Sequence, residues 1–191
     1  MANLSKSLVP VHSAPDIPSA LRHTPFGRLL NYHNCGRMFK KHAKAELLVC
    51  MCMDNRKQLR LPDNFAYILR TGGGNIRYSE FKISYVVGIG GVRYIAMIAH
   101  DNCGMVDLAS KRERFVSGLV KNGGWTRKDA TQHFLKNVPR FEIGDEIEFV
   151  HQEALRLSLK YPGVKVLPLF YRMADKKIYL IKTSPSNKKQ K

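Results

Sequence analysis

The segment LLVCMCMDNRKQLRL, residues 47–61, changes character in its middle: an apolar run ends in two cysteines one residue apart, and an aspartate and an arginine follow. A short, fully apolar run is typical of a strand buried on both faces of a sheet. The cysteines allow three interpretations, namely core packing, a redox pair, or metal ligands beside a charged pair. The rest of the chain has to decide among them.

The pattern of strands and helices predicts an α/β fold. Strands are predicted at 45–53, 65–70, 93–99, 164–173 and 176–181, and helices at 26–43, 79–87, 106–120, 126–137 and 142–161. Because strands that are apolar on both faces alternate with helices, we expect a mainly parallel sheet of four to five strands flanked by helices. The last two strands form a hairpin, which predicts an antiparallel C-terminal edge strand.

The 191 residues, 44% of them hydrophobic, fit one globular domain with a substantial core. The proline-rich start predicts an extended N-terminal arm over residues 1–25. Residues 26–182, including the N-terminal helix, then form a single α/β domain. Residues 183–191 are predicted to be a disordered basic tail.

Cysteine use and hydropathy indicate the compartment. The four cysteines are too sparse and too irregularly spaced for a secreted disulfide scaffold. No apolar leader and no run of eighteen apolar residues is present, so we expect a soluble cytoplasmic protein with free thiols and no membrane partner.

The charge is strongly basic, with 32 Lys and Arg against 15 Asp and Glu, a net charge of +17. Such a charge suits a polyanion, but no zinc finger, RNP-type aromatic pattern or helix-turn-helix accompanies it. The charge is therefore interpreted as a solvated basic face, and a nucleic-acid partner is not predicted.

Three predicted strands end in unusual residues, and the carboxyl ends of parallel strands are where ligand sites form. The endings are CMDNR (52–56), RTGGGN (70–75) and HDNCGM (100–105). Cys52, His100 and Cys103 together make a recognised zinc set of two sulfurs and one imidazole. Three protein ligands leave the fourth position open, as in catalytic zinc sites.

Asp54 and Arg56 lie two residues apart beyond Cys52, so an extended backbone places all three on one wall of the site. An aspartate held ionised by a guanidinium is a pure hydrogen-bond acceptor, able to orient the oxygen nucleophile on a metal. Released from the arginine, the same carboxylate is able to take the fourth metal position. Taken alone, each motif has an ordinary interpretation: buried Cys, or a surface ion pair.

These motifs resemble those of a known family. CMDNR, RTGGGN and AHDNCGM (99–105) are similar to the C-x-D-x-R, R-N-A-G-G and H-x-x-C-G motifs of the β-class carbonic anhydrases, in the same order along the chain. The resemblance covers residues 45–105 well and the C-terminal strands loosely. Met53 and Met105 are more similar to a subgroup with C-M-D-x-R and H-x-D-C-G-M motifs, which includes enzymes that hydrolyse carbon disulfide or carbonyl sulfide.

The resemblance implies a zinc lyase. Cys52, His100 and Cys103 would hold Zn²⁺, and Asp54 with Arg56 would gate and orient a zinc-bound hydroxide that hydrates carbon dioxide reversibly to bicarbonate and a proton. Cys50 is then left as core. We also expect Gly73 and Gly104 to contact the substrate.

The family also implies a homodimer or higher homo-oligomer, whose N-terminal helix, here 26–43, embraces the neighbouring subunit. Two departures stand out. Thr71-Gly72 replaces the Asn-Ala of the second motif, and Asp101 adds an acid to the third. No proton shuttle is identified among the other histidines. Two alternative functions stay open: a hydrolase of carbon disulfide or carbonyl sulfide on the same zinc site, and a non-catalytic metal- or polyanion-binding protein of the same fold.

Overall fold

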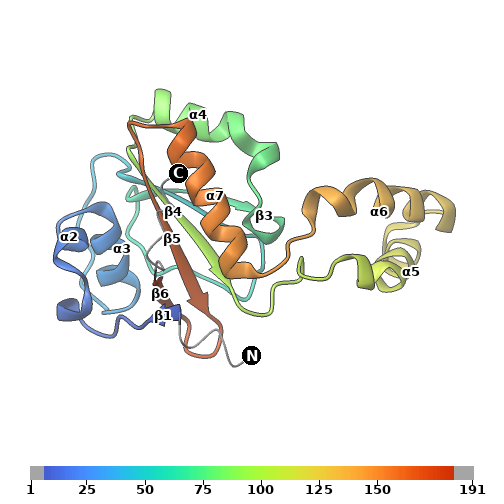
Figure 1. Ribbon diagram of the computed structural model, residues 1–191, viewed down its shortest axis with the longest axis horizontal. Coiled ribbons are helices and arrows are strands. Elements are labelled where there is room, and N and C mark those ends of the chain that lie inside the picture. The colour runs from blue at the N-terminus through green and yellow to red at the C-terminus, as the bar shows by residue number, and fades with distance from the viewer. Residues whose placement is uncertain (1–6, 183–191) are drawn as a thin grey trace, which may run out of the picture.

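The structure, a computed structural model, describes residues 7–182 and is built on one six-stranded sheet with the order β1-β6-β5-β4-β2-β3 (Figure 1). The strands are β1 (Leu8–Val9), β2 (Leu47–Cys52), β3 (Ala66–Thr71), β4 (Tyr94–His100), β5 (Lys165–Arg172) and β6 (Lys177–Ile181). Strands β3, β2, β4 and β5 run parallel to one another, and β6 is antiparallel to β5. The predicted fold class is confirmed.

The sheet has one strand more than expected. Strand β1 pairs antiparallel with β6, Leu8 opposite Ile181 and Val9 opposite Leu180, so β6 is not the edge of the sheet. A strand of two residues followed by a proline carries no hydrophobic periodicity, and the sequence alone therefore gives no sign of it.

Helices cover both faces of the sheet. They are α2 (Ser19–Arg22), α3 (Pro25–His33), α4 (Glu80–Gly88), α5 (Arg112–Gly123), α6 (Arg127–Phe141) and α7 (Glu146–Lys160). Helix α3 packs Leu29 and Leu30 into the core on one face, and α4 and α7 contribute Ile83, Val86 and Leu157 to the core on the other. Figure 1 shows α7 lying across β4 and β5. Burying a side chain such as Leu157 stabilises the fold by about 1.5–3 kcal/mol.

The helix predicted over residues 26–43 is wrong in length. Helix α3 ends at His33, and Gly36 adopts a left-handed backbone with φ of 69°. Asn34 ends the helix because its side-chain amide bonds the backbone of other segments: Nδ2 donates to the carbonyls of Val11 (2.9 Å) and Ile178 (2.6 Å). The apolar residue Met38 beyond this point is 84% exposed. Helix α3 packs on the sheet of its own chain. Its contact with a neighbouring subunit stays a prediction.

Two further helices begin later than predicted. Asp145 caps α7 by accepting hydrogen bonds from the amides of Ile147 and Glu148, both at 2.9 Å, so α7 begins at Glu146, four residues later than predicted. Helix α5 starts at Arg112, after a 3₁₀ turn at Ala109–Lys111, and not at residue 106. Further 3₁₀ turns lie at Ala14–Asp16, Gly72–Gly74 and Arg77–Ser79.

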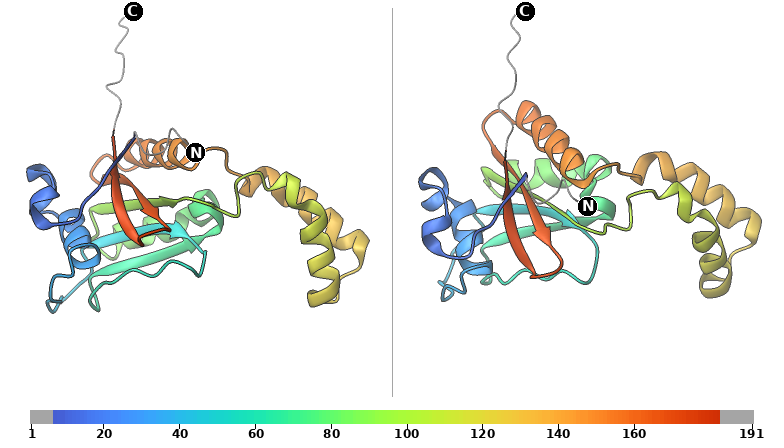
Figure 2. Two further views of the ribbon diagram at one scale, coloured as in Figure 1. Left: turned by 90° about the horizontal axis from the view of Figure 1, so that it is seen from below. Right: turned by 60° about the horizontal axis from the view of Figure 1, so that its bottom comes forward.

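Helices α5 and α6 form a hairpin that stands away from the sheet (Figure 2). It has a small core of its own, in which Val116, Ala130 and Phe134 are buried. Loops at both ends connect the hairpin to the site region, one after the HDNCGM motif and one before α7.

The N-terminal segment predicted as an extended arm contains β1, a 3₁₀ turn and α2 in its described part, residues 7–25. The basic tail predicted at 183–191 lies outside the described residues. Between residues 7 and 182, no helix is both long enough and apolar enough to cross a membrane.

Candidate metal centre

The site forms where the strand order of the sheet reverses. From β2 the chain continues to β3 on one side and later to β4 on the other, so the carboxyl ends of β2 and β4 lie next to each other at a topological switch point. Cys52 is the last residue of β2 and His100 the last residue of β4. Cys103 follows three residues later in the loop.

The structure brings the three predicted ligands together. Three possible ligand atoms, one from each of Cys52, His100 and Cys103, lie within 4.8 Å of one another. All three residues are buried. Cys50 lies on the same strand but two residues deeper, about 7 Å along it, and belongs to the core against α4 and α7. Burial raises the pKa of the Cys50 thiol to about 12.

A hydrogen bond to the imidazole ring of His100 fixes which of its two nitrogens carries the proton. Nδ1 lies 2.8 Å from the carbonyl oxygen of Asp101, which only accepts, so Nδ1 carries the proton. Nε2 is buried and, within residues 7–182, has no hydrogen-bond partner. A bare, buried imidazole nitrogen oriented by a backbone carbonyl is the arrangement that metal-binding histidines use.

The two sulfurs shift each other's pKa. The neighbouring Cys103 thiol lowers the pKa of Cys52, and Cys52 together with burial raises the pKa of Cys103. A metal binds cysteine as the thiolate, so metal binding would release the thiol protons. Two sulfurs and one free imidazole nitrogen fit Zn²⁺, with one coordination position left open.

Asp54 and Arg56 form a tight pair beside the ligands. Arg56 donates from Nε (3.0 Å) and from its backbone amide (2.9 Å) to Oδ1 of Asp54, and from Nη2 to Oδ2 (2.5 Å). Nη2 also donates to the carbonyl of Asn102 (3.1 Å), which joins the β2 loop to the β4 loop. Hydrogen bonds from Arg56 hold the pKa of Asp54 well below its usual range. The carboxylate points at Arg56, and Asp54 is not a member of the Cys-His-Cys group.

The glycine loop closes the site from the third strand. Gly73 has φ of 64°, and a Cβ there would come within 3.2 Å of Ile143 and Met105, so the loop needs glycine at this position. Ile143 packs against Cys52 and Cys103, with Val106 and Phe149 beside it. Gly104 has open space around its Cα, and its carbonyl accepts from Lys111 Nζ (2.8 Å).

Several residues other than the predicted ligands and the dyad lie around this site. Oε1 of Glu146, the first residue of α7, lies 3.4 Å from the amide of Cys103. Asp101, noted as an extra acid, accepts from the amide of Met173 (2.7 Å) and so ties the loop to the end of β5. Lys57 and Thr71 each bury a polar atom without a hydrogen-bond partner in the described chain. A lysine within RKQLR carries no local signal of burial.

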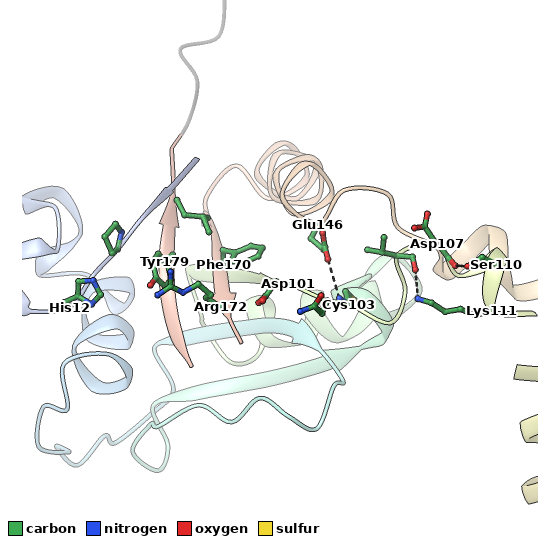
Figure 3. Close-up of a pocket in the computed structure, with 14 residues that line it drawn as sticks. His12, Asp101, Cys103, Asp107, Ser110, Lys111, Glu146, Phe170, Arg172 and Tyr179 are labelled. Carbon is green, nitrogen blue, oxygen red and sulfur yellow. Dashed lines mark hydrogen bonds between the residues drawn. The ribbon is translucent and has the colours of Figure 1, made fainter. Parts of the chain in front are cut away.

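A cavity of about 830 Å³ opens beside the Asp101–Cys103 loop (Figure 3). Its lining includes His12 from the N-terminal segment, Glu146, Arg172 and Tyr179. His12 lies at the end of the cavity away from Cys103 in Figure 3, so the cavity extends well beyond the ligand group.

Comparison with known proteins gives similarity at the level of the fold. A scan against protein-family models and a search of curated proteins both give no match. Among solved structures, a carbonic anhydrase from Glaciozyma antarctica superimposes with a TM-score of 0.55 at 21% identity, over 72% of this chain and 83% of that chain. The chain has the fold of the β-carbonic anhydrases.

Two further structures extend the likeness. β-Carbonic anhydrase isoform I from Trichomonas vaginalis gives a TM-score of 0.55 at 17% identity, over 78% of this chain and 91% of that chain. The apo form of a carbon disulfide hydrolase gives 0.51 at 15% identity, over 78% and 84%. At these identities the likeness establishes the fold, and the chemistry has to be argued from the site.

The ligand group predicts how zinc content responds to mutation. Wild-type protein should bind about one zinc per chain, because three donors converge on one point. Cys103→Ala should lose most of this zinc, whereas the matched control Cys50→Ala should keep it, since Cys50 lies deeper in the core. Metal analysis after dialysis measures both. Full zinc retention by Cys103→Ala would refute the ligand set.

The Asp54–Arg56 pair predicts a dependence of stability on pH. The pKa of Asp54 is depressed in the folded state, so its contribution is present above its unfolded pKa of about 4 and is lost as the pH falls below that value. Because Arg56 is half exposed, Asp54→Asn should cost no more than about 1 kcal/mol near neutral pH. Urea unfolding from neutral to acidic pH should show this difference shrinking. A difference that grows on acidification would contradict the assignment.

Proposed function

We propose that the protein is a zinc-dependent carbonic anhydrase, which converts carbon dioxide and water reversibly to bicarbonate and a proton. The observation that carries the proposal is the convergence of Cys52, His100 and Cys103 at the switch point of the sheet, with a free Nε2 on His100. The Asp54–Arg56 pair beside this group adds a carboxylate that would orient the attacking oxygen.

Zinc held by these three residues would supply a Lewis acid that acidifies a water molecule at the open position. Other residues of the chain hold the ligand side chains in place. The carbonyl of Asp101 fixes the His100 tautomer, and the amide of Cys103 lies near Glu146 Oε1, so the loop that carries two of the three ligands is held from both sides.

Asp54 would orient the attacking oxygen. Since Arg56 keeps the carboxylate ionised, Asp54 acts only as a hydrogen-bond acceptor. It can accept the hydrogen of a water-derived nucleophile, so that a lone pair of the nucleophile's oxygen faces the carbon atom of carbon dioxide. Freed from Arg56, the carboxylate would be able to take the open metal position and close the site.

The apolar wall suits a linear, apolar substrate. Ile143 is buried against the two sulfurs, with Met105, Val106 and Phe149 packed beside it. Carbon dioxide needs such a slot and no strong hydrogen bond in the ground state. Gly73, which sits against Ile143 and Met105, keeps the slot free of a further side chain.

The same features favour a second candidate, hydrolysis of carbon disulfide or carbonyl sulfide. These molecules are also linear and apolar, and a carbon disulfide hydrolase is among the structures with this fold. Carbon disulfide is longer than carbon dioxide, so the depth of the slot at Ile143 would decide between them. Release of hydrogen sulfide from either substrate measures this activity directly.

We also propose that the chain forms a homodimer or a larger homo-oligomer. Strand β3 ends the sheet, exposes Tyr67 and Ile68, and pairs on its outer side with no other strand of residues 7–182. An exposed apolar edge is a site for pairing with a second chain. Gel filtration should give at least a dimer, which Ile68→Lys weakens and the exposed control Ile89→Lys does not. A monomeric wild-type protein would exclude the assembly.

The function is tested by stopped-flow hydration of carbon dioxide on the zinc-loaded protein between about pH 7 and 9. Asp54→Asn should keep zinc and lose at least about a hundredfold in kcat, since it removes a group that positions the reacting oxygen. The control Asp107→Asn changes an exposed acid at the neighbouring cavity and should retain full activity.

A rate no higher than that of buffer for the wild type would refute the proposal. Hydrogen sulfide release in the absence of carbon dioxide hydration would favour the second candidate. An Asp54→Asn variant with wild-type rates would remove Asp54 from the mechanism while leaving the metal site intact.

A further inference from the structure

Lys57 is buried in a way that its position in the sequence does not predict. Only 1% of the residue is exposed, and its Nζ finds no hydrogen-bond partner within the described residues. An unpaired ammonium in a protein interior costs several kcal/mol unless a counter-charge or ligand offsets it. A site that retains such a group has a use for its charge.

Hydrogen bonds from other residues hold the backbone around Lys57 in place. The amide of Lys57 donates to the carbonyl of Asp54 (3.4 Å), and its carbonyl accepts from Arg70 Nη2 (3.0 Å). Arg70 Nη1 also reaches the carbonyls of Cys52 and Asp54, both at 3.4 Å. Arg70, on β3, thus holds the loop that carries the first metal ligand, the dyad aspartate and Lys57.

The charge of Lys57 acts on the metal site. Burial lowers the pKa of Lys57, while the neighbouring Cys52, Asp54 and Cys103 raise it. In return, Lys57 lowers the pKa of each of these three groups. Lys57 is therefore a positive charge within electrostatic reach of two predicted ligands and of the dyad aspartate.

A second buried donor without a partner lies opposite Cys52, at the end of the neighbouring strand β3. Thr71 stands opposite Cys52 in the parallel register of β2 and β3, so both side chains emerge on the same face of the sheet. Its Oγ1 is buried and, in the part of the chain that is described, makes no hydrogen bond. An ammonium and a hydroxyl are both donors that suit an anion.

The charges around the site leave Lys57 uncompensated once a metal binds. Two cysteine thiolates balance Zn²⁺, and Asp54 is balanced by Arg56, to which it is bonded. The ammonium of Lys57 has no hydrogen-bonded counter-charge among the described residues. A small anion at the site would supply that counter-charge.

We infer that Lys57, together with Thr71, binds a small monoanion at the metal site. Under the proposed function, on which this identification rests, the anion is bicarbonate, the charged partner in the reaction. Lys57 then contributes to affinity for the anion, while the apolar wall at Ile143 serves the neutral substrate. Anion affinity, and not turnover alone, therefore distinguishes Lys57 from the residues of the dyad.

The inference is tested with the full-length protein loaded with Co²⁺, whose visible absorption changes when an anion binds. Bicarbonate and nitrate are titrated separately into wild type, Lys57→Met, Thr71→Val and the control Lys82→Met. Lys57→Met should raise the Kd of both anions about tenfold or more, as expected for loss of a charged hydrogen bond. Thr71→Val should raise it less. Lys82→Met removes an exposed charge and should leave it unchanged.

Stability of the metal-free protein provides a second readout. Methionine matches the length of lysine without its charge, so Lys57→Met should raise the midpoint of thermal unfolding. A less stable Lys57→Met with wild-type anion affinity would show a structural role and overturn the inference. If Lys57→Met does not fold or does not bind Co²⁺, Lys57→Gln takes its place in the titration. Wild-type anion affinity in both Lys57→Gln and Thr71→Val would then overturn the inference.

The two proposals fail in different ways. Lys57-dependent anion binding in a protein that does not hydrate carbon dioxide would refute the proposed function and leave the anion site standing. Hydration of carbon dioxide with wild-type anion affinity in Lys57→Met would refute the anion site alone.

Discussion

The parallel pairing of β2 with β4 is the constraint on which the site depends. Because the two strands run in the same direction in adjacent positions, with Met51 opposite Ile98, their carboxyl ends emerge side by side at one edge of the sheet. An antiparallel arrangement would place Cys52 and His100 at opposite ends of strands about 20 Å long. The apolar faces of both strands, covered by α3 on one side and by α4 and α7 on the other, keep this pairing buried.

Within the site, each functional group is set by a neighbour from another segment. The backbone of the β4 loop fixes the imidazole of His100, and the same loop places the Cys103 sulfur within 4.8 Å of the sulfur of Cys52. Arg56 holds Asp54 and also reaches the carbonyl of Asn102, so that the dyad and the ligands cannot shift independently. Support of each functional group by a second segment is the condition for precise positioning at a binding or catalytic site.

The electrostatics of the site explain why polar atoms remain without partners inside a well-packed protein. His100 Nε2, Lys57 Nζ and Thr71 Oγ1 are three of the four buried side-chain atoms that lack a hydrogen bond among residues 7–182. Unpaired polar atoms are rare in protein interiors because they cost free energy. Under the proposals made above, a metal would bind His100 Nε2 and an anion would pair with Lys57 and Thr71, which accounts for the free energy that these unpaired atoms cost.

Local patterns identified most of the framework. The buried strands, the capped start of α6 at Thr126 and the order of the three motifs follow from hydrophobic runs and short-range chemistry. The helix over residues 26–43 was wrong because its apolar spacing continued past a point where Asn34 bonds two distant backbone segments. Strand β1 was missed because two residues carry no periodicity, and only the partner strand defines them.

The sequence by itself determined which residues are available as ligands, their order along the chain, and the strands that present them, because these depend on residue type and on periodicities of a few residues. Only the tertiary structure decided that Asp54 faces Arg56 and that Lys57 is buried. Burial, charge environment and side-chain direction are set by segments far apart in the chain. These properties exist only once β2, β3 and β4 have paired and their loops have met.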